Sequence, residues 1–313
     1  MRWLRRIGIG LALIAIGTSS CAQGVIDGSG RRGVPYRQAS PGPFIETAGV
    51  QTRYERWGTT GSPIVLVHGF IESTYAWRPV AERLARDHVV YALDLRGFGF
   101  TERRGPYGLE GWTRQLQAFL AALAIDRPLL VGHSLGAAVV AEVARLTPDA
   151  VAGIVLADGD ARKRGAGPPA FVRNLIRDPW FAALFRIATR RDWAAAAILP
   201  RVWGPNPPAF DHAAIAPWLD PFRVEGAEEA LRELAHQPVA GLDDDKIATI
   251  RTPALVLWGA HDDNVPLASG REVAGLLRAR VVILADAGHL SMLADPAGFA
   301  RSIEEFAATL SAR

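Results

Sequence analysis

The chain has 313 residues, 49% of them hydrophobic, which is enough apolar material for one large core with an insertion. Its formal net charge is only +3, and the three arginines in the first six residues account for that excess. The remaining chain is balanced, so no general positive charge favours binding to nucleic acid. The single cysteine, Cys21, excludes an intrachain disulfide and argues against a cysteine-ligated metal.

Residues 1–20 have the pattern of an export signal. Arginines precede an uncharged apolar run over 7–17, which is shorter than the roughly 20 residues that a membrane-spanning helix needs. Cys21 follows small residues, where a bacterial lipoprotein signal has its lipidated cysteine, although Thr18 replaces the usual bulkier aliphatic residue. We therefore expect an exported protein of the bacterial cell envelope that is attached to the membrane through Cys21. Cleavage near Ala22, giving a periplasmic protein, and an uncleaved anchor are the alternatives.

Residues 21–43 are rich in Gly, Arg, Ser and Pro and have no hydrophobic periodicity, which predicts a flexible tether. The folded domain is expected to begin at Phe44. A hairpin is predicted around Ala48-Gly49, and the apolar run 64–67 predicts a buried strand that ends at His68-Gly69.

Strands and amphipathic helices then alternate along the chain. The predicted helices cover 74–86, 109–124 and 135–146, and the predicted strands cover 89–93, 129–131 and 153–157. Continuous apolar strands separated by helices indicate a mostly parallel sheet that is covered on both faces.

The alternation stops between residues 159 and 238, where short helical pieces rich in Ala, Arg, Trp and Pro replace it. It resumes with strands at 254–258 and 281–284 and helices at 267–277 and 296–310. We therefore predict an α/β core made of 44–158 and 239–313, with residues 159–238 inserted as a helical cap. The cap tryptophans are expected to pack against the core, and Arg162-Lys163-Arg164 is expected to be a solvated basic turn rather than an attractor of anionic substrates.

The segment Gly132-His133-Ser134-Leu135-Gly136 lies between a predicted strand and a predicted helix. In that context, the pattern Gly-x-Ser-x-Gly forms a tight turn that exposes the serine hydroxyl above the sheet. Ser134 is therefore the candidate nucleophile. The flanking His133 and the earlier His68 are expected to brace loops by hydrogen bonds rather than to react.

Further polar residues follow the ends of other strands, where the ligands of such sheets gather. They are His68-Gly69-Phe70, Asp94 with the loop to Gly99, Asp262, and Gly288-His289. With Ser134, Asp262 and His289 in this order, the chain resembles the α/β-hydrolase superfamily over roughly residues 44–310, in its serine-nucleophile branch with an inserted cap. The resemblance implies an α/β-hydrolase fold with a mostly parallel central sheet.

The resemblance also implies roles for these residues. His289 would take the proton of Ser134, because imidazole titrates near neutrality, and Asp262 would orient its ring. Asp158 is an alternative acid, whereas Asp263 is expected to be a solvated loop residue.

Negative charge develops on the substrate oxygen during such a reaction and requires two N–H donors. The resemblance assigns these donors to the backbones of Phe70 and Leu135. Their side chains are expected to line an apolar substrate pocket.

Together these features predict a serine hydrolase that cleaves an ester or related acyl bond of a small, apolar substrate, without a cofactor or metal. A serine in the turn argues against the dehalogenase and epoxide-hydrolase branches, which have aspartate there. Carbon–carbon bond hydrolases and cofactor-free peroxidase-like relatives keep the serine and remain alternatives. A non-catalytic envelope binding protein is less favoured, because no member of the Ser134, Asp262 and His289 set is missing.

Overall fold

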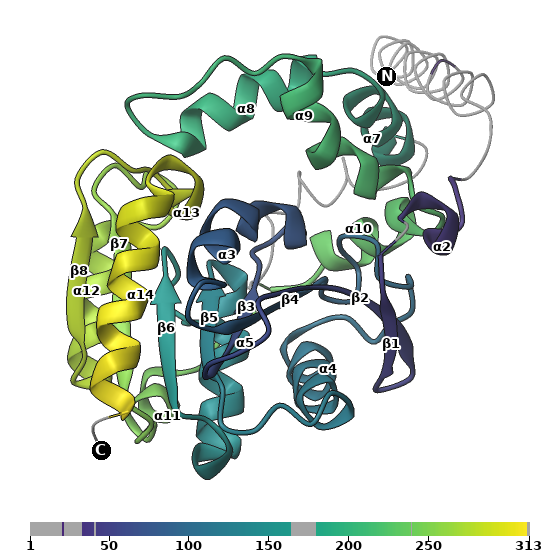
Figure 1. Cartoon of the computed structure of the whole chain (residues 1–313). Helices are drawn as coiled ribbons and strands as arrows, with labels where there is room; N and C mark the ends of the chain where they lie inside the picture. Colours follow the sequence, from purple (N-terminus) through teal and green to yellow (C-terminus); the bar gives the residue numbers. More distant parts are fainter. Residues whose placement is uncertain (1–20, 22–32, 41, 164–179, 239, 312–313) are drawn as a thin grey trace, which may run out of the picture.

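The computed structural model describes residues 21, 33–40, 42–163, 180–238 and 240–311 (Figure 1). The predicted export signal lies outside the described residues. Cys21 is exposed and is not in a disulfide. Among the described residues, no helix combines the length and the apolar character needed to cross a membrane.

An eight-stranded sheet forms the centre of the molecule, in the spatial order β1-β2-β4-β3-β5-β6-β7-β8. The strands β1 and β2 pair antiparallel with each other, β2 pairs antiparallel with β4, and the other neighbours are parallel. This arrangement confirms the predicted α/β-hydrolase fold. The strands are β1 (Phe44–Thr47), β2 (Val50–Trp57), β3 (Pro63–Val67), β4 (Val89–Leu93), β5 (Leu129–His133), β6 (Gly153–Ala157), β7 (Ala254–Gly259) and β8 (Arg280–Leu284).

The hairpin between β1 and β2 turns at the predicted place. Ala48 has φ 48° and Gly49 has φ 82°, so both turn residues occupy the left-handed region. A two-residue turn of this kind matches the right-handed twist of the strands that it joins. The Gly49 N–H also donates to the Glu46 carboxylate at 2.7 Å, which holds the turn closed.

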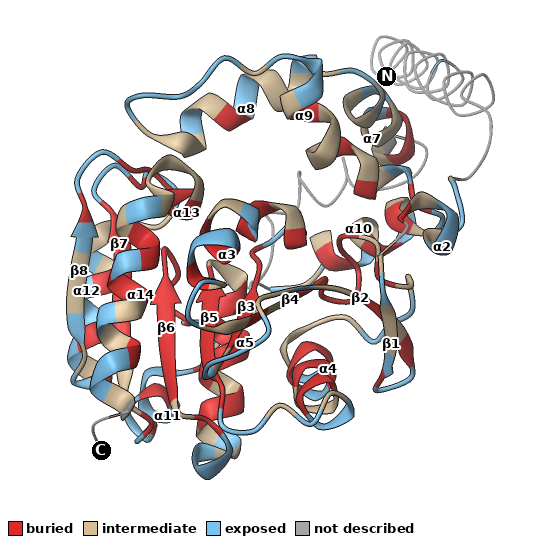
Figure 2. Cartoon of the chain, in the orientation of Figure 1, coloured by how far each residue is buried: buried red, intermediate tan, exposed pale blue. Residues whose placement is uncertain are grey.

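Alternate residues of β3 face opposite sides of the sheet, because side chains alternate along a strand. Val65 and Val67 pack with α4 (Leu109–Ala122), α5 (Leu135–Leu146) and α12 (Leu267–Leu277). Ile64 and Leu66 pack with α3 (Arg78–Leu84) and α14 (Pro296–Ser311). Two apolar layers therefore cover the sheet, and Figure 2 shows buried residues concentrated on its strands.

The helix predicted over 74–86 is divided. Its first turn is the 3₁₀ helix η1 (Thr74–Trp77), and α3 follows directly. The Ser73 hydroxyl accepts from the Tyr75 N–H at the start of η1, and Pro79 is an early residue of α3, so both pieces begin with residues suited to helix starts.

The cap lies beyond the carboxyl ends of the parallel strands, as the upper helices of Figure 1 show. Its described helices are α7 (Trp180–Arg190), α8 (Trp193–Trp203), α9 (His212–Leu219), η3 (Asp220–Arg223) and α10 (Ala227–Ala235). The chain returns to the core through α11 (Asp244–Ala248). The short helices η2 (Pro148–Ala150) and α13 (Ser291–Ala294) complete the core.

Within the predicted flexible tether of residues 21–43, the structure describes residues 21, 33–40, 42 and 43, and some of these have partners elsewhere in the fold. Val34 pairs with Val224 of the cap, and α2 (Tyr36–Ala39) follows it. The Ser40 hydroxyl accepts from the Arg53 guanidinium at 2.9 Å. These partners lie far away in the sequence, so the local composition did not reveal them.

Candidate active site

Ser134 occupies a strained turn between β5 and α5, with φ 50° and ψ −112°. A non-glycine residue held in a sparsely populated backbone region costs about 1–3 kcal/mol, which the surrounding structure must compensate. The neighbouring glycines are needed for close approach: a Cβ on Gly132 would lie 2.3 Å from the Gly136 carbonyl oxygen, and one on Gly136 would lie 2.3 Å from the Val67 oxygen. The turn therefore presents the Ser134 hydroxyl at the end of the sheet.

Ser134, His289 and Asp262 form one hydrogen-bonded series. His289 Nε2 lies 3.1 Å from Ser134 Oγ, and His289 Nδ1 lies 2.8 Å from Asp262 Oδ2. Because the carboxylate accepts from Nδ1–H, Nε2 is left free to accept the serine proton. The other Asp262 oxygen, Oδ1, accepts from the Asn264 and Val265 N–H groups at 2.8 and 2.9 Å, which fixes the carboxylate plane.

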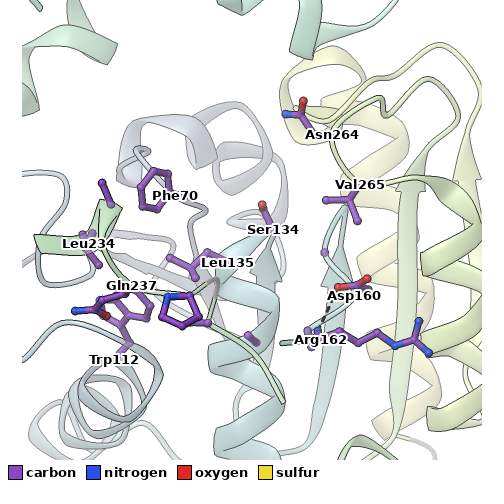
Figure 3. Close-up of a pocket in the computed structure, with 16 residues that line it drawn as sticks. Phe70, Trp112, Ser134, Leu135, Asp160, Arg162, Leu234, Gln237, Asn264 and Val265 are labelled. Carbon is purple, nitrogen blue, oxygen red and sulfur yellow. Dashed lines mark hydrogen bonds between the residues drawn. The ribbon is translucent and has the colours of Figure 1, made fainter. Parts of the chain in front are cut away.

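The two predicted N–H donors flank Ser134. Leu135 is the first residue of α5, where a helix leaves its N–H groups without intrahelical acceptors and carries a partial positive charge. Phe70 follows β3, whose carboxyl end lies beside that of β5. Both residues line the same pocket as Ser134 (Figure 3).

Asp158, the alternative acid, has other partners. Its Oδ1 accepts from the Gly259 N–H at 2.7 Å, and its Oδ2 accepts from the Ser291 hydroxyl. Burial raises the pKa of Asp158 to about 7, with help from the Asp262 charge and against the attraction of His133 and His289. Asp158 therefore ties β6 to β7 and α13, while Asp262 contacts the His289 ring. Asp263 is exposed.

Two buried histidines next to the site have different environments. Burial lowers the pKa of His68, which stays neutral. Burial also disfavours the charged form of His133. The charge and hydrogen bond of Glu72, the charge of Asp158 and the hydrogen bond to the His289 carbonyl outweigh this effect of burial, and together they raise the pKa of His133 to about 9. His133 Nδ1 lies 3.0 Å from Glu72 Oε1, so the two side chains form a buried ion pair.

Glu72 and Ser291 are site residues that the sequence analysis missed. Glu72 is the only acidic residue between Glu55 and Glu82, and it lies directly after the Phe70 loop. A lone carboxyl group in an apolar segment beside a candidate site was the available signal. Ser291, two residues after His289, offered no comparable signal.

A pocket of about 670 Å³ opens in front of Ser134. In Figure 3, Phe70, Leu135, Trp112 and Leu234 lie on one side of the serine, and Asn264, Val265, Asp160 and Arg162 lie on the other. The side that includes Phe70 is mainly apolar, with Gln237 as a hydrogen-bonding group, whereas Asn264, Asp160 and Arg162 lie on the opposite side. Such a pocket suits a small molecule with one apolar end.

Arg162 is held by acidic groups of the core. Its guanidinium lies 2.8 Å from Asp244 Oδ1 and also pairs with Glu272. These ion pairs compensate its charge, and Arg164 lies outside the described residues. No group of three or more His, Cys, Asp and Glu side chains suited to a metal ion occurs in the part of the chain that the structure describes.

The cap tryptophans have different roles. Trp218 contacts Tyr75 of the core edge to face, with ring centroids 5.8 Å apart, and Trp203 packs on Phe210 within the cap. Trp193 is 58% exposed and so departs from the expected packing against the core. The pocket is lined by Trp112 of α4, which belongs to the core.

The end of α8 contacts the loop that carries His289. The Gly288 N–H donates to the Trp203 carbonyl at 2.8 Å, and the Leu290 N–H donates to the Val202 carbonyl at 2.9 Å. The cap therefore holds the residues on both sides of His289 through backbone hydrogen bonds.

An eight-stranded, mostly parallel sheet with Ser134, Asp262 and His289 at its strand ends defines a hydrolase of the α/β class. The chain belongs to the alpha/beta hydrolase family, whose model matches residues 64–302. This match confirms the predicted resemblance to the α/β-hydrolase superfamily.

Curated relatives include two proteins of Pseudomonas putida. The chain is 31% identical over 257 residues to the dihydrolipoyllysine-residue acetyltransferase component of an acetoin cleaving system, a match that covers 80% of this chain but 65% of that relative. It is 28% identical over 299 residues to a 2-hydroxy-6-oxo-2,4-heptadienoate hydrolase, covering 86% of this chain and 97% of the relative.

Among solved structures, an enol-lactonase from Burkholderia xenovorans matches with a TM-score of 0.69 and 25% identity, covering 85% of this chain and 100% of that one. Hydrolases recur among these relatives and neighbours, and the chain is an enzyme of the hydrolase class.

Proposed function

We propose that the protein is a serine hydrolase that cleaves a carboxylic ester of a small, apolar substrate through an acyl-enzyme on Ser134. One observation carries this proposal: Ser134, which is bonded to His289 and through it to Asp262, lines a pocket with a mainly apolar side. The serine hydroxyl is weakly nucleophilic by itself, and a base at 3.1 Å is within reach to activate it.

In the proposed reaction, Ser134 Oγ attacks the ester carbonyl carbon while His289 Nε2 takes the serine proton. The N–H groups of Phe70 and Leu135 stabilise the oxyanion that forms, and Asp262 stabilises the imidazolium. The tetrahedral intermediate collapses to the acyl-enzyme, and the alcohol leaves with the proton from His289. Water then gives a proton to His289 and attacks the acyl carbon, which releases the carboxylic acid and restores Ser134.

The pocket supports a substrate of modest size. A volume of about 670 Å³ is within the usual range for small-molecule sites. The acyl group would lie against Trp112, Leu135 and Leu234, with the alcohol toward Asn264. The similarity to an enol-lactonase adds support, because an enol lactone is a cyclic carboxylic ester.

Hydrolysis of a carbon–carbon bond is the second candidate. The relative named 2-hydroxy-6-oxo-2,4-heptadienoate hydrolase favours it, because a substrate of that name has no ester or amide and must be cleaved at carbon. Such a reaction would use the same Ser134, His289 and Asp262. The two candidates differ in their substrates, so paired kinetics separate them.

A fluorophosphonate probe tests the serine chemistry directly. We expect rapid labelling of the wild-type protein and none of Ser134→Ala. A series of p-nitrophenyl esters from acetate to laurate then measures the acyl preference, and a dienoate ketone serves as the carbon–carbon substrate. Labelling that persists in Ser134→Ala, or a wild type that is not labelled, would contradict the serine mechanism. Turnover of the ketone alone would favour the second candidate.

We also propose that the protein is exported to the cell envelope and attached to the membrane through a lipid on Cys21. The arginines, the apolar run over 7–17 and the exposed free cysteine support this proposal. Metabolic labelling with an alkyne fatty acid should mark the wild-type protein and not Cys21→Ala. Equal labelling of both would point to another site, and release of unlabelled protein to the periplasm would point to cleavage near Ala22.

A further inference from the structure

The peptide between Gly69 and Phe70 is held at its carbonyl. The Gly69 carbonyl accepts from His68 Nδ1 at 2.7 Å. In a planar trans peptide, the C=O and the following N–H point in opposite directions. The bond from His68 therefore sets the direction of the Phe70 N–H, which is one of the two proposed oxyanion donors.

The protonation state of His68 is set by its second partner. The Leu95 N–H donates to His68 Nε2 at 2.9 Å, and a backbone N–H can only donate. Nε2 must be unprotonated, so the single proton of the neutral ring lies on Nδ1, facing the Gly69 carbonyl. His68 is fully buried, and burial favours this neutral form.

The backbone N–H of Gly69 is held by Glu72. The Gly69 N–H donates to Glu72 Oε2 at 2.9 Å, and the Glu72 carboxylate also accepts from His133 Nδ1. Each residue of this group is buried. An unpaired carboxylate here would be costly, so the Glu72–His133 pair acts as a unit.

His133 connects this pair to the proposed base. Its Nε2 lies 2.7 Å from the His289 carbonyl oxygen, and its ring centroid is 4.9 Å from that of His289. Both His133 nitrogens face oxygen acceptors, so both carry protons and the ring is a cation. The backbone of His289 is therefore bonded to the same series that holds Gly69.

We propose that His68, Glu72 and His133 are positioning residues that fix the Phe70 N–H relative to His289. They form a continuous hydrogen-bonded series from His68 through Gly69, Glu72 and His133 to the His289 carbonyl. None of the three reacts with the substrate. The inference rests on the proposed serine-hydrolase function, because only that chemistry gives the Phe70 N–H an oxyanion to stabilise.

This role has a specific kinetic signature. The oxyanion exists in the tetrahedral state and not in the bound ester, so a misplaced donor weakens binding of the transition state alone. A variant in which the Phe70 N–H is displaced should therefore have a lower kcat and a nearly unchanged KM. It should also weaken the binding of a boronic acid, whose tetrahedral serine adduct resembles that state.

The experiment uses one disruptive and one conservative variant at each end of the series. Glu72→Ala removes the acceptor of the Gly69 N–H, whereas Glu72→Gln keeps an oxygen there. His68→Phe removes the donor to the Gly69 carbonyl, whereas the Asn side chain of His68→Asn places an N–H near the original Nδ1. The control is Thr52→Val, which breaks the buried hydrogen bonds of the Thr52 hydroxyl to Thr47 and Gln115, outside the series from His68 to His289.

With p-nitrophenyl acetate, we expect kcat to fall roughly tenfold to hundredfold in Glu72→Ala and His68→Phe, less than the roughly 10²- to 10³-fold cost of removing one oxyanion donor, because the Phe70 N–H is displaced and not removed. KM should change by less than about threefold, and phenylboronic acid should bind more weakly by a factor similar to the loss in kcat. Glu72→Gln and His68→Asn should recover most of the lost kcat. Thr52→Val should lower the melting temperature and leave kcat unchanged.

The inference would be overturned if folded variants keep kcat and boronate affinity within about twofold of the wild type, or if the conservative variants recover nothing. Should one disruptive variant fail to fold, the disruptive variant at the other end of the series still decides: a loss of boronate affinity of tenfold or more supports the inference, and an unchanged affinity opposes it. Fluorophosphonate labelling separates the two proposals. A wild type that resists the probe and does not hydrolyse esters overturns both, whereas a labelled, active wild type with unaffected variants overturns the positioning role alone.

Discussion

Two buried aspartates next to His289 have different hydrogen-bond partners, and this difference predicts different roles for them. Asp262 Oδ2 lies 2.8 Å from His289 Nδ1, whereas the Asp158 oxygens are bonded to Gly259 and Ser291. An acid that orients the imidazole must contact Nδ1–H. Only Asp262 does so among the described residues.

Asp262→Asn should therefore lower kcat for p-nitrophenyl acetate by about 10³- to 10⁴-fold, because an amide stabilises neither the productive tautomer nor the imidazolium. Asp158→Asn should retain activity within about tenfold, since the amide can keep a bond to the Gly259 N–H. Steady-state kinetics of both variants check this prediction. The reverse ranking would identify Asp158 as the acid.

Asp158 should also make stability depend on pH. Its pKa is raised to about 7 from an ordinary value of 3.8, so the stability that its neutral form contributes is fully present below 3.8 and is lost as pH rises through about 7. In the Asp158→Asn variant, the amide side chain does not titrate, so this dependence on pH is lost. The free energy of unfolding of the variant, minus that of the wild type, should rise by a few kcal/mol at most between pH 4 and pH 8. Urea titrations at both pH values measure the difference, and an equal difference at both would contradict the assignment.

The residues that the sequence could predict are those that follow strand ends in a fixed order. Ser134, Asp262 and His289 each follow an apolar strand, so their meeting at one edge of the sheet could be expected. Glu72 could not be paired with His133 in this way, because 61 residues separate them in the chain and Glu72 lies in a loop whose path the sequence pattern does not predict.

At the level of elements, the turn between β5 and α5 is limited by backbone contacts. A Cβ on Gly136 would lie 2.3 Å from the Val67 oxygen of β3, so α5 starts as close to the sheet as a glycine permits. The tight contact places Ser134 and the Leu135 N–H against the end of β3. Any side chain at position 136 would therefore have to push α5 away from β3.

Gly136→Ala should therefore lower the free energy of unfolding by about 1–3 kcal/mol and reduce fluorophosphonate labelling of Ser134. Gly275→Ala is the matched control, because Gly275 also lies in a helix, α12, and a Cβ there would meet no atom within 4 Å. That change should raise stability by about 0.5–1 kcal/mol through helix propensity. Equal effects of the two substitutions would contradict the role of close approach.

The strands and helices of the core could be predicted well, because the hydrophobic residues of buried strands and amphipathic helices follow a regular spacing in the sequence. The predicted hairpin, central strands and closing helix agree with the structure to within a few residues. The stretch from Val34 to Ser40 could not be predicted, because its order comes from Val224 and Arg53, which local composition does not reveal.

At the level of the whole molecule, the cap and the core share the loop around His289. Gly204, after α8, has φ 118°, and a Cβ there would lie 2.6 Å from the Gly288 nitrogen. A substitution at Gly204 should therefore separate α8 from this loop and loosen the base. The cap position could not be derived from the sequence, since nearly all residues of α8 and α9 are apolar and these helices have no single apolar face that selects a partner.

Gly204→Ala should lower kcat for a small ester by roughly tenfold, although Gly204 belongs to neither the pocket nor the reacting residues. Gly226→Ala is the control, because Gly226 is also a cap glycine with positive φ but contacts the Arg103 side chain. The Gly226→Ala substitution should lower the melting temperature and change kcat only slightly. Kinetics and thermal melting of the two variants check this expectation, and an unchanged kcat in Gly204→Ala would contradict it.

The backbone bonds from Trp203 and Val202 to the residues flanking His289 make the position of the proposed base depend on the cap. A displacement of α8 from this loop would break both bonds together. His289 would then lose the contacts that hold its backbone beside Ser134. Hydrolysis would thus be confined to molecules in which α8 is docked on the loop, so a change in the cap would be felt as a change in the reactivity of the serine.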